Sequence, residues 1–126
     1  MKRVIAAIIM LLISVVFSFI SNYIIIKESD SLTDSLNELM ILAKNGTEIE
    51  IQNKIKSVNI EWNKNKWIFF TFSSSDDIAK TDTDIKMLSF LYEQKSENEF
   101  YETCVNIYNN ISSINKSEKL SFENIF

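Results

Sequence analysis

The feature that most constrains this chain is an uncharged run of mostly apolar residues from Val4 to Ile26, 23 residues long. As an α-helix the run would measure about 34 Å, enough to cross a bilayer core of about 30 Å. An export signal has a shorter apolar region, about 7–15 residues, followed by small residues at the cleavage site. Here the run ends in three isoleucines, which are too bulky for that site. The run therefore predicts an uncleaved signal anchor, with a cleaved export signal and a buried helix of a soluble protein as the alternatives.

Charge is distributed unevenly on the two sides of this run. Lys2 and Arg3 precede it, whereas 11 lysines and all 17 acidic residues follow it, so the part after Ile26 has a net charge of −6. Because basic flanks stay cytoplasmic, we expect a single-pass protein of the cell membrane with its N-terminus inside. Residues 1–26 would be the cytoplasmic tip and transmembrane anchor, and residues 27–126 an extracytoplasmic domain. The expected partners are the lipid bilayer, through Val4–Ile26, and another membrane protein; so acidic a domain repels phosphate, and nucleic acid is not expected.

The composition favours helices, because the chain has no proline and a single glycine, Gly46, which suits a helix stop. A hydroxyl residue followed three positions later by an acidic one marks a helix start at Ser31, Thr47 and Ser96, and serines 73–75 offer further caps. Apolar residues recur at helical spacing in four stripes: Leu32, Leu36, Leu39, Leu42 and Ala43; Ile51, Ile55, Val58 and Trp62; Ile78, Ile85, Leu88, Leu91 and Tyr92; Phe100, Cys104, Ile107, Ile111 and Ile114. These patterns predict an all-α fold, an N-terminal transmembrane helix followed by a small antiparallel four-helix bundle.

Three segments need an interpretation of their own. Nothing between Ile26 and Ser31 breaks a helix, so the anchor can run almost continuously into the first bundle helix. Residues 67–72 have strand-like composition, but no second such run exists to pair with them, and we expect the fully buried end of a long helix. The apolar residues at the end of the chain predict a short closing segment that packs back on the bundle: Leu120, Phe122, Ile125 and Phe126.

The chain is poor in residues that carry chemistry. It has no histidine, and its one cysteine, Cys104, lies in an apolar stripe and suits a small core residue. Zinc sites of the usual kind and glycine-rich phosphate loops cannot form. Asp82 and Asp84 begin like a calcium loop, but Lys86 and Met87 stand where a ligand and a glycine are needed. We therefore expect no enzyme, no cofactor and no metal site, and a solvated acidic helix face around residues 76–84.

Two sets of residues are candidates for a partner or ligand surface. Trp62 and Trp67 can build a ligand pocket or a protein contact, although core packing is the favoured interpretation. Ser14 and Ser18 lie along one side of the anchor, where a second membrane helix can pack closely. The plainer alternative, which we favour, is that these serines bond to the backbone of their own helix.

Several of these features together resemble a known family. They are the short basic start, the single span, the helix with Trp62 and Trp67, and the ending Leu-Ser-x-Glu-Asn-Ile at residues 120–125. The chain resembles a bacterial family of Firmicutes, the domain of unknown function numbered four-three-six-three. The resemblance implies a bacterial single-span protein with a helical domain outside the cytoplasm, and it implies no activity. Members often carry a histidine after the tryptophan segment, where this chain has serines 73–75, so no histidine-based role carries over.

Two functions of different classes remain. The first is a membrane-anchored extracytoplasmic interaction or scaffold module, an accessory to another membrane protein. The alternative is a sensor-like helical domain that binds a small ligand near Trp62 and Trp67 and acts through a partner. A cavity beside the tryptophans would favour the alternative.

Overall fold

The computed structural model describes residues 1–73 and 75–125, and within them it contains four α-helices and no β-strand. The helices are α1 (Lys2–Asn45), α2 (Glu48–Phe72), α3 (Ser75–Glu93) and α4 (Glu97–Ile125). The predicted all-α fold is confirmed. Residues 67–72 are helical and belong to α2, as expected, because a lone strand would leave its backbone groups unpaired.

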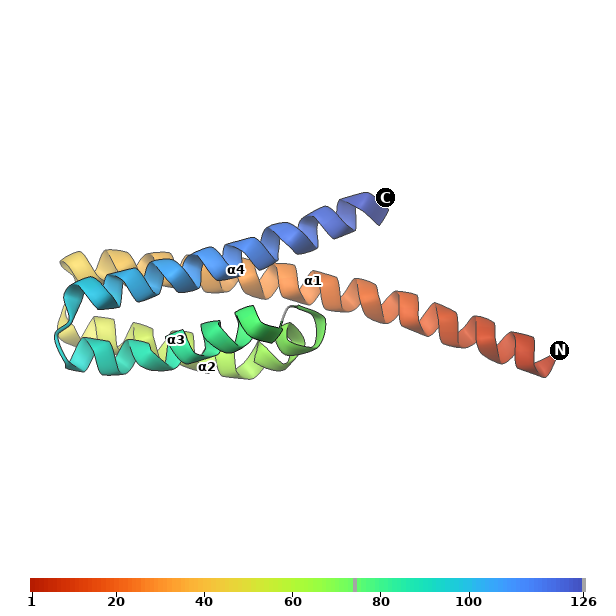
Figure 1. Ribbon diagram of the computed structural model, residues 1–126, viewed down its shortest axis with the longest axis horizontal. Coiled ribbons are helices and arrows are strands. Elements are labelled where there is room, and N and C mark those ends of the chain that lie inside the picture. Colours follow the sequence, from red (N-terminus) through yellow and green to blue (C-terminus); the bar gives the residue numbers. More distant parts are fainter. Residues whose placement is uncertain (74, 126) are drawn as a thin grey trace.

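The helices form an antiparallel bundle with short connections (Figure 1). Helix α1 packs on α2 and α4, and α3 packs on the same two helices from the other side. The predicted stripes face one another in a single core, except for Ala43, which is exposed; Trp62 and Phe69 are the largest core side chains. The N-terminal part of α1 projects far beyond the other three helices (Figure 1), and its residues 1–18 are all exposed.

Helix α1 passes through the expected division at residue 26 without a break. The helix start predicted at Ser31 is wrong, because α1 is continuous from Lys2 to Asn45. The Ser31 hydroxyl instead donates a hydrogen bond to the carboxylate of Glu61 in α2. The anchor run and the first bundle helix are therefore one element, and the N-terminal half of α1 needs no linker to the bundle.

The connection between α1 and α2 follows the sequence signals closely. Thr47 is the N-cap of α2, and its hydroxyl accepts a hydrogen bond from the Glu50 amide at 3.3 Å. Gly46 ends α1 as predicted, but its φ of −88° is not the left-handed conformation that usually selects glycine. A Cβ at Gly46 would lie 2.7 Å from the Leu42 carbonyl oxygen, so the close approach of the chain to α1 is what requires glycine here.

The connection between α3 and α4 contains a strained residue. Lys95 has a φ of 57°, in the left-handed region that costs a residue with a side chain about 1–2 kcal/mol. The Ser96 amide donates to the Leu91 carbonyl at 3.2 Å and the Lys95 amide to the Tyr92 carbonyl at 3.1 Å, which is the pattern of a helix C-cap motif. Glycine is the usual residue at the position of Lys95 in this motif.

Replacing Lys95 with glycine should therefore stabilise the bundle. We expect Lys95→Gly to raise the free energy of unfolding by up to about 1 kcal/mol, because glycine adopts the left-handed conformation without strain. The measurement is chemical denaturation in detergent micelles, followed by circular dichroism. The control is Lys56→Gly at an exposed position within α2, which should lower the free energy of unfolding by about 1 kcal/mol.

Cys104 is fully buried in the α4 stripe, as predicted. Burial disfavours the thiolate and raises the pKa of the Cys104 thiol to about 12. The thiol is therefore both inaccessible and protonated at neutral pH, and it serves as a small apolar core residue.

Labelling of Cys104 with a maleimide should consequently follow global unfolding. We expect no reaction with the folded chain at neutral pH and complete reaction in denaturant, with the two changes at the same denaturant concentration as the loss of helix. Intact-mass measurement of the labelled fraction tests this. Rapid labelling of the folded chain would show that the core around α4 opens locally.

Candidate functional site

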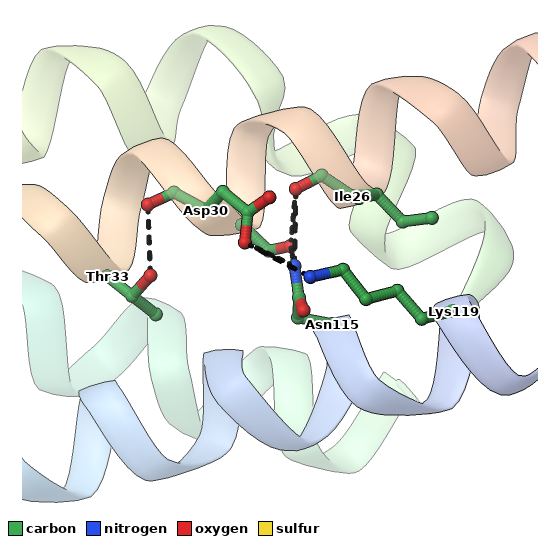
Figure 2. A network of polar contacts seen from close by, with 6 residues as sticks. Ile26, Asp30, Thr33, Asn115 and Lys119 are labelled. Carbon is green, nitrogen blue, oxygen red and sulfur yellow. Dashed lines mark hydrogen bonds and ion pairs between the residues drawn. The ribbon is translucent and has the colours of Figure 1, made fainter.

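A partly buried polar network joins α1 to α4 near the middle of the bundle (Figure 2). The Asn115 amide nitrogen donates to three acceptors on α1: the Ser29 hydroxyl at 2.6 Å, the Asp30 carboxylate at 3.0 Å and the Ile26 carbonyl at 3.2 Å. Lys119 adds a longer ion pair to Asp30, 3.7 Å between nitrogen and oxygen. Because these partners are specific, the network sets the register of α4 along α1.

One turn nearer the projecting end of α1, a second polar pair connects the same two helices. The Asn22 amide nitrogen donates to the Glu118 carboxylate at 2.6 Å and to the Glu118 backbone carbonyl at 3.2 Å. Burial raises the pKa of the Glu118 carboxyl above its usual value, and the hydrogen bond from Asn22 offsets part of that increase. The side-chain oxygen of Asn22 is buried and has no hydrogen-bond partner among the described residues. The pair therefore offers two acceptors, the Asn22 oxygen and the Glu118 carboxylate.

Asn22 and Glu118 line a mostly apolar cleft of about 410 Å³. The rest of the lining comes from three helices: Val15, Ser18, Phe19, Ser21 and Ile25 of α1, Phe72 of α2, and Ser121 and Phe122 of α4. Helices α1 and α4 diverge at this end of the bundle (Figure 1), and the cleft lies between them. The cleft is large enough for a small ligand or part of a longer apolar molecule. We call it the α1–α4 cleft.

Aromatic rings form the walls of the α1–α4 cleft. Phe17 of α1 contacts Phe72 at the end of α2, with ring centroids 5.8 Å apart. Phe19 contacts Phe122 of α4 edge to face, with centroids 6.1 Å apart. The ends of α2 and α4 thus lie against the apolar run of α1, within residues that the sequence assigned to the anchor.

The end of α2 departs from the prediction, because it is not fully buried. Trp67 is 59% exposed, and Phe70 and Phe72 are each more than one-third exposed. Residues 67–72 are apolar almost all round the helix, but a four-helix bundle covers only one side of each helix. The remaining rings face outward at the same end of the bundle as the α1–α4 cleft.

The prediction of a short closing segment that packs back on the bundle is wrong. Residues after 119 continue α4 instead of folding back, and they diverge from α1 (Figure 1). Leu120 is exposed, and Phe122 is the residue that reaches α1. The side chain of Ile125 and the whole of Phe126 lie outside the described residues. The apolar end of the chain is therefore a helix edge beside the α1–α4 cleft.

The two tryptophans lie in different environments. Trp62 is buried in the core, as predicted, with its ring 5.3 Å from that of Phe69. Trp67 is exposed, which contradicts the core placement expected for it. Neither the α1–α4 cleft nor a second hollow of about 550 Å³ between α1 and α2 is lined by either residue. The geometry does not favour a ligand pocket at the tryptophans.

Trp62 has a polar partner that the sequence did not suggest. Its indole nitrogen donates to the Asp82 carboxylate at 2.9 Å, and Lys86 and Lys66 pair with the same carboxylate at 3.0 and 3.5 Å. Partial burial raises the pKa of Asp82, but the Trp62 and Lys86 hydrogen bonds and the two lysine charges outweigh it, so the pKa lies below its usual value. Asp82 is thus a structural partner of Trp62, and the acidic stretch is not wholly a solvated face.

The serines of the apolar run of α1 lie in different environments. Ser14 is exposed, and its hydroxyl donates to the Met10 carbonyl at 2.9 Å, which is the plainer of the two interpretations. Ser18 lines the α1–α4 cleft, and Ser21 is buried with its hydroxyl bonded to the Phe17 carbonyl. Of the candidate surface residues, only Ser18 contributes to the cleft. Across residues 1–73 and 75–125, no cluster of three histidine, cysteine or acidic side chains is placed to hold a metal ion.

The sequence patterns did not single out Asn22, Asn115 and Glu118, although one signal was present. The α4 stripe continues past Ile114 at a spacing of four to Glu118, where the pattern asks for an apolar residue. A charged side chain at a stripe position must find a partner or reach water. That signal points to Glu118, but it does not name Asn22 as the partner.

Comparison of the chain with family models, curated proteins and solved structures finds no match.

The Asn115 network yields a direct test of the α1–α4 register. Asn115→Ala should lower the free energy of unfolding by about 1–3 kcal/mol, because it removes three hydrogen bonds to α1 and leaves the buried Ser29 hydroxyl without its donor. The matched control is Asn109→Ala, an exposed asparagine on the same helix, which should change it by no more than about 0.5 kcal/mol. Denaturation in detergent micelles measures both. Equal effects of the two variants would remove the role assigned to Asn115.

Proposed function

We propose that this protein is a single-span membrane-anchored interaction module that holds a helical bundle outside the cytoplasm as an accessory to another membrane protein. The observation that carries the proposal is the continuity of α1. Its N-terminal half is exposed and apolar, and it is the helix in the described part of the chain that is long and apolar enough to cross a membrane. Its C-terminal half is one wall of the bundle.

This continuity suits a module that couples a membrane partner to an external surface. No flexible linker separates the anchor from the bundle, so a shift or rotation of the anchor moves the bundle with it. The basic Lys2 and Arg3 and the acidic part beyond Ile26 support the orientation with the bundle outside. The absence of histidine from the sequence supports a non-enzymatic role.

The membrane anchor and its orientation can be tested on one variant. Asn109→Cys places a thiol on the exposed face of α4, while the native Cys104 is buried and serves as the internal control. We expect a membrane-impermeant maleimide to label Asn109→Cys on intact cells. Carbonate-washed membranes should retain the chain with its full-length mass. Labelling only after permeabilisation would reverse the orientation, and a shortened soluble chain would identify an export signal.

The partner is tested by photocrosslinking in the native membrane. A photoreactive residue at Ser14, which is exposed on the anchor, should give a crosslinked product with another membrane protein at native expression. The control position is Ile55 in the bundle core, where only crosslinks within the chain are expected. Recovery of only the monomer from both positions would contradict the accessory role.

A further inference from the structure

The apolar run of α1 is only partly clear of the bundle. Val4–Val16, 13 residues, measures about 20 Å as a helix, whereas a bilayer core is about 30 Å thick. From Phe17 onward the rings of Phe72 and Phe122 lie against α1. For α1 to cross a bilayer, about 10 Å of hydrocarbon must therefore lie at the level of the bundle's end.

The α1–α4 cleft is where hydrocarbon can reach that level. On the cleft side, α1 contributes Val15, Ser18, Phe19 and Asn22 to the lining, and Phe19 and Asn22 also contact α4. Counted along this side, Val4 to Asn22 is 19 residues, or about 28 Å, which matches the core thickness. A lipid chain that follows α1 into the cleft therefore surrounds α1 with hydrocarbon over nearly the full thickness of the bilayer core.

The bundle's end also carries charges, beside the exposed Phe70, Phe72 and Leu120. Asp76 and Asp77 in the first turn of α3, and Glu123 in α4, are exposed charges at this end. Such charges are costly in hydrocarbon and stable among headgroups. Trp67 and Tyr23, both exposed, suit the same interfacial layer. We therefore place the bundle's end in the headgroup layer. The bundle does not enter the hydrocarbon core of the bilayer, and a lipid chain instead reaches up into the α1–α4 cleft.

The polarity of the cleft follows the order of a phospholipid. The part nearer the projecting end of α1 is lined by the apolar Val15, Phe19 and Phe122 together with Ser18 and Ser121, whereas Asn22 and Glu118 lie nearer the bundle core, next to Ile25. Val15 and Asn22 are about 10 Å apart along the helix axis. Two hydrogen-bond acceptors lie here, the Asn22 oxygen and the Glu118 carboxylate. They are suited to a headgroup that donates hydrogen bonds.

We propose that the α1–α4 cleft binds one acyl chain of a phospholipid from the outer leaflet, with an amine headgroup held at Glu118 and Asn22. This inference rests on the proposed crossing of the membrane by α1. An ethanolamine ammonium donates three hydrogen bonds, whereas a choline headgroup donates none, so the site distinguishes the two. A bound lipid then forms part of the surface that the bundle presents at the membrane.

The test uses the full chain in vesicles of phosphatidylethanolamine and phosphatidylcholine. A trace of one or the other carries a photoreactive group in its acyl chain near the glycerol, and mass spectrometry locates the crosslinks. We expect the yield at Phe19 and Phe122, normalised to that at the exposed Leu12, to be about tenfold higher with the ethanolamine lipid. Glu118→Gln should reduce this preference to about twofold or less.

Two variants one turn apart on α1 separate the cleft from the general lipid surface. Ser18→Phe fills the cleft and should lower the crosslinking yield at Phe122 by at least about fivefold. Ser14→Phe adds the same ring outside the cleft and should leave that yield unchanged. Circular dichroism of each variant checks that the bundle is folded.

Equal yields with the two lipids, or no effect of Ser18→Phe, would overturn the lipid site. A photoreactive residue at position 122 gives a further test. A crosslink from it to a second copy of the chain or to another protein would also overturn the lipid site, because that occupant would exclude the lipid. Carbonate washing of the same vesicles keeps the two proposals apart. A retained chain without a cleft signal contradicts only the lipid site, whereas a released chain contradicts the membrane anchor itself.

Discussion

The continuity of α1 is the constraint on which the rest of the structure depends. At 44 residues the helix is about 66 Å long, and no proline or internal glycine interrupts it. The same helix is the apolar projection and one wall of the bundle, and α2 and α4 both pack on it. The bundle therefore cannot turn relative to the projection unless α1 bends, which gives the molecule a rigid axis from end to end.

Polar side chains at stripe positions decide how α4 lies along this axis. Asn115 binds three acceptors on α1, and one turn further the Asn22–Glu118 pair replaces the apolar contact that the stripe would otherwise make. Such groups hold a register through specific partners, but they fill space less completely than branched apolar side chains. Beyond Glu118 the two helices diverge, and the α1–α4 cleft lies in the space between them.

The aromatic end of the bundle follows from the same geometry. In a four-helix bundle each helix turns one side to the core and the other side outward. A helix segment that is apolar on every side therefore leaves some of its residues uncovered. Trp67, Phe70 and Phe72 of α2 are in this position, and Leu120 of α4 joins them. These exposed residues lie beside the apolar run of α1, and that position is the basis for proposing a lipid neighbour.

The sequence by itself determined the all-α fold, the boundary between two helices at Gly46 and Thr47, and most residues of the four buried stripes, because helical periodicity and capping depend on residues only a few positions apart. It also placed Trp62 and Cys104 in the core. Only the tertiary structure decided that Trp67 faces outward, that Asn115 and Glu118 meet α1, and that a cleft forms between the diverging helices. These features depend on which stripes face one another and where the helices stop covering each other, and those contacts join residues up to 96 positions apart, beyond the reach of any local pattern.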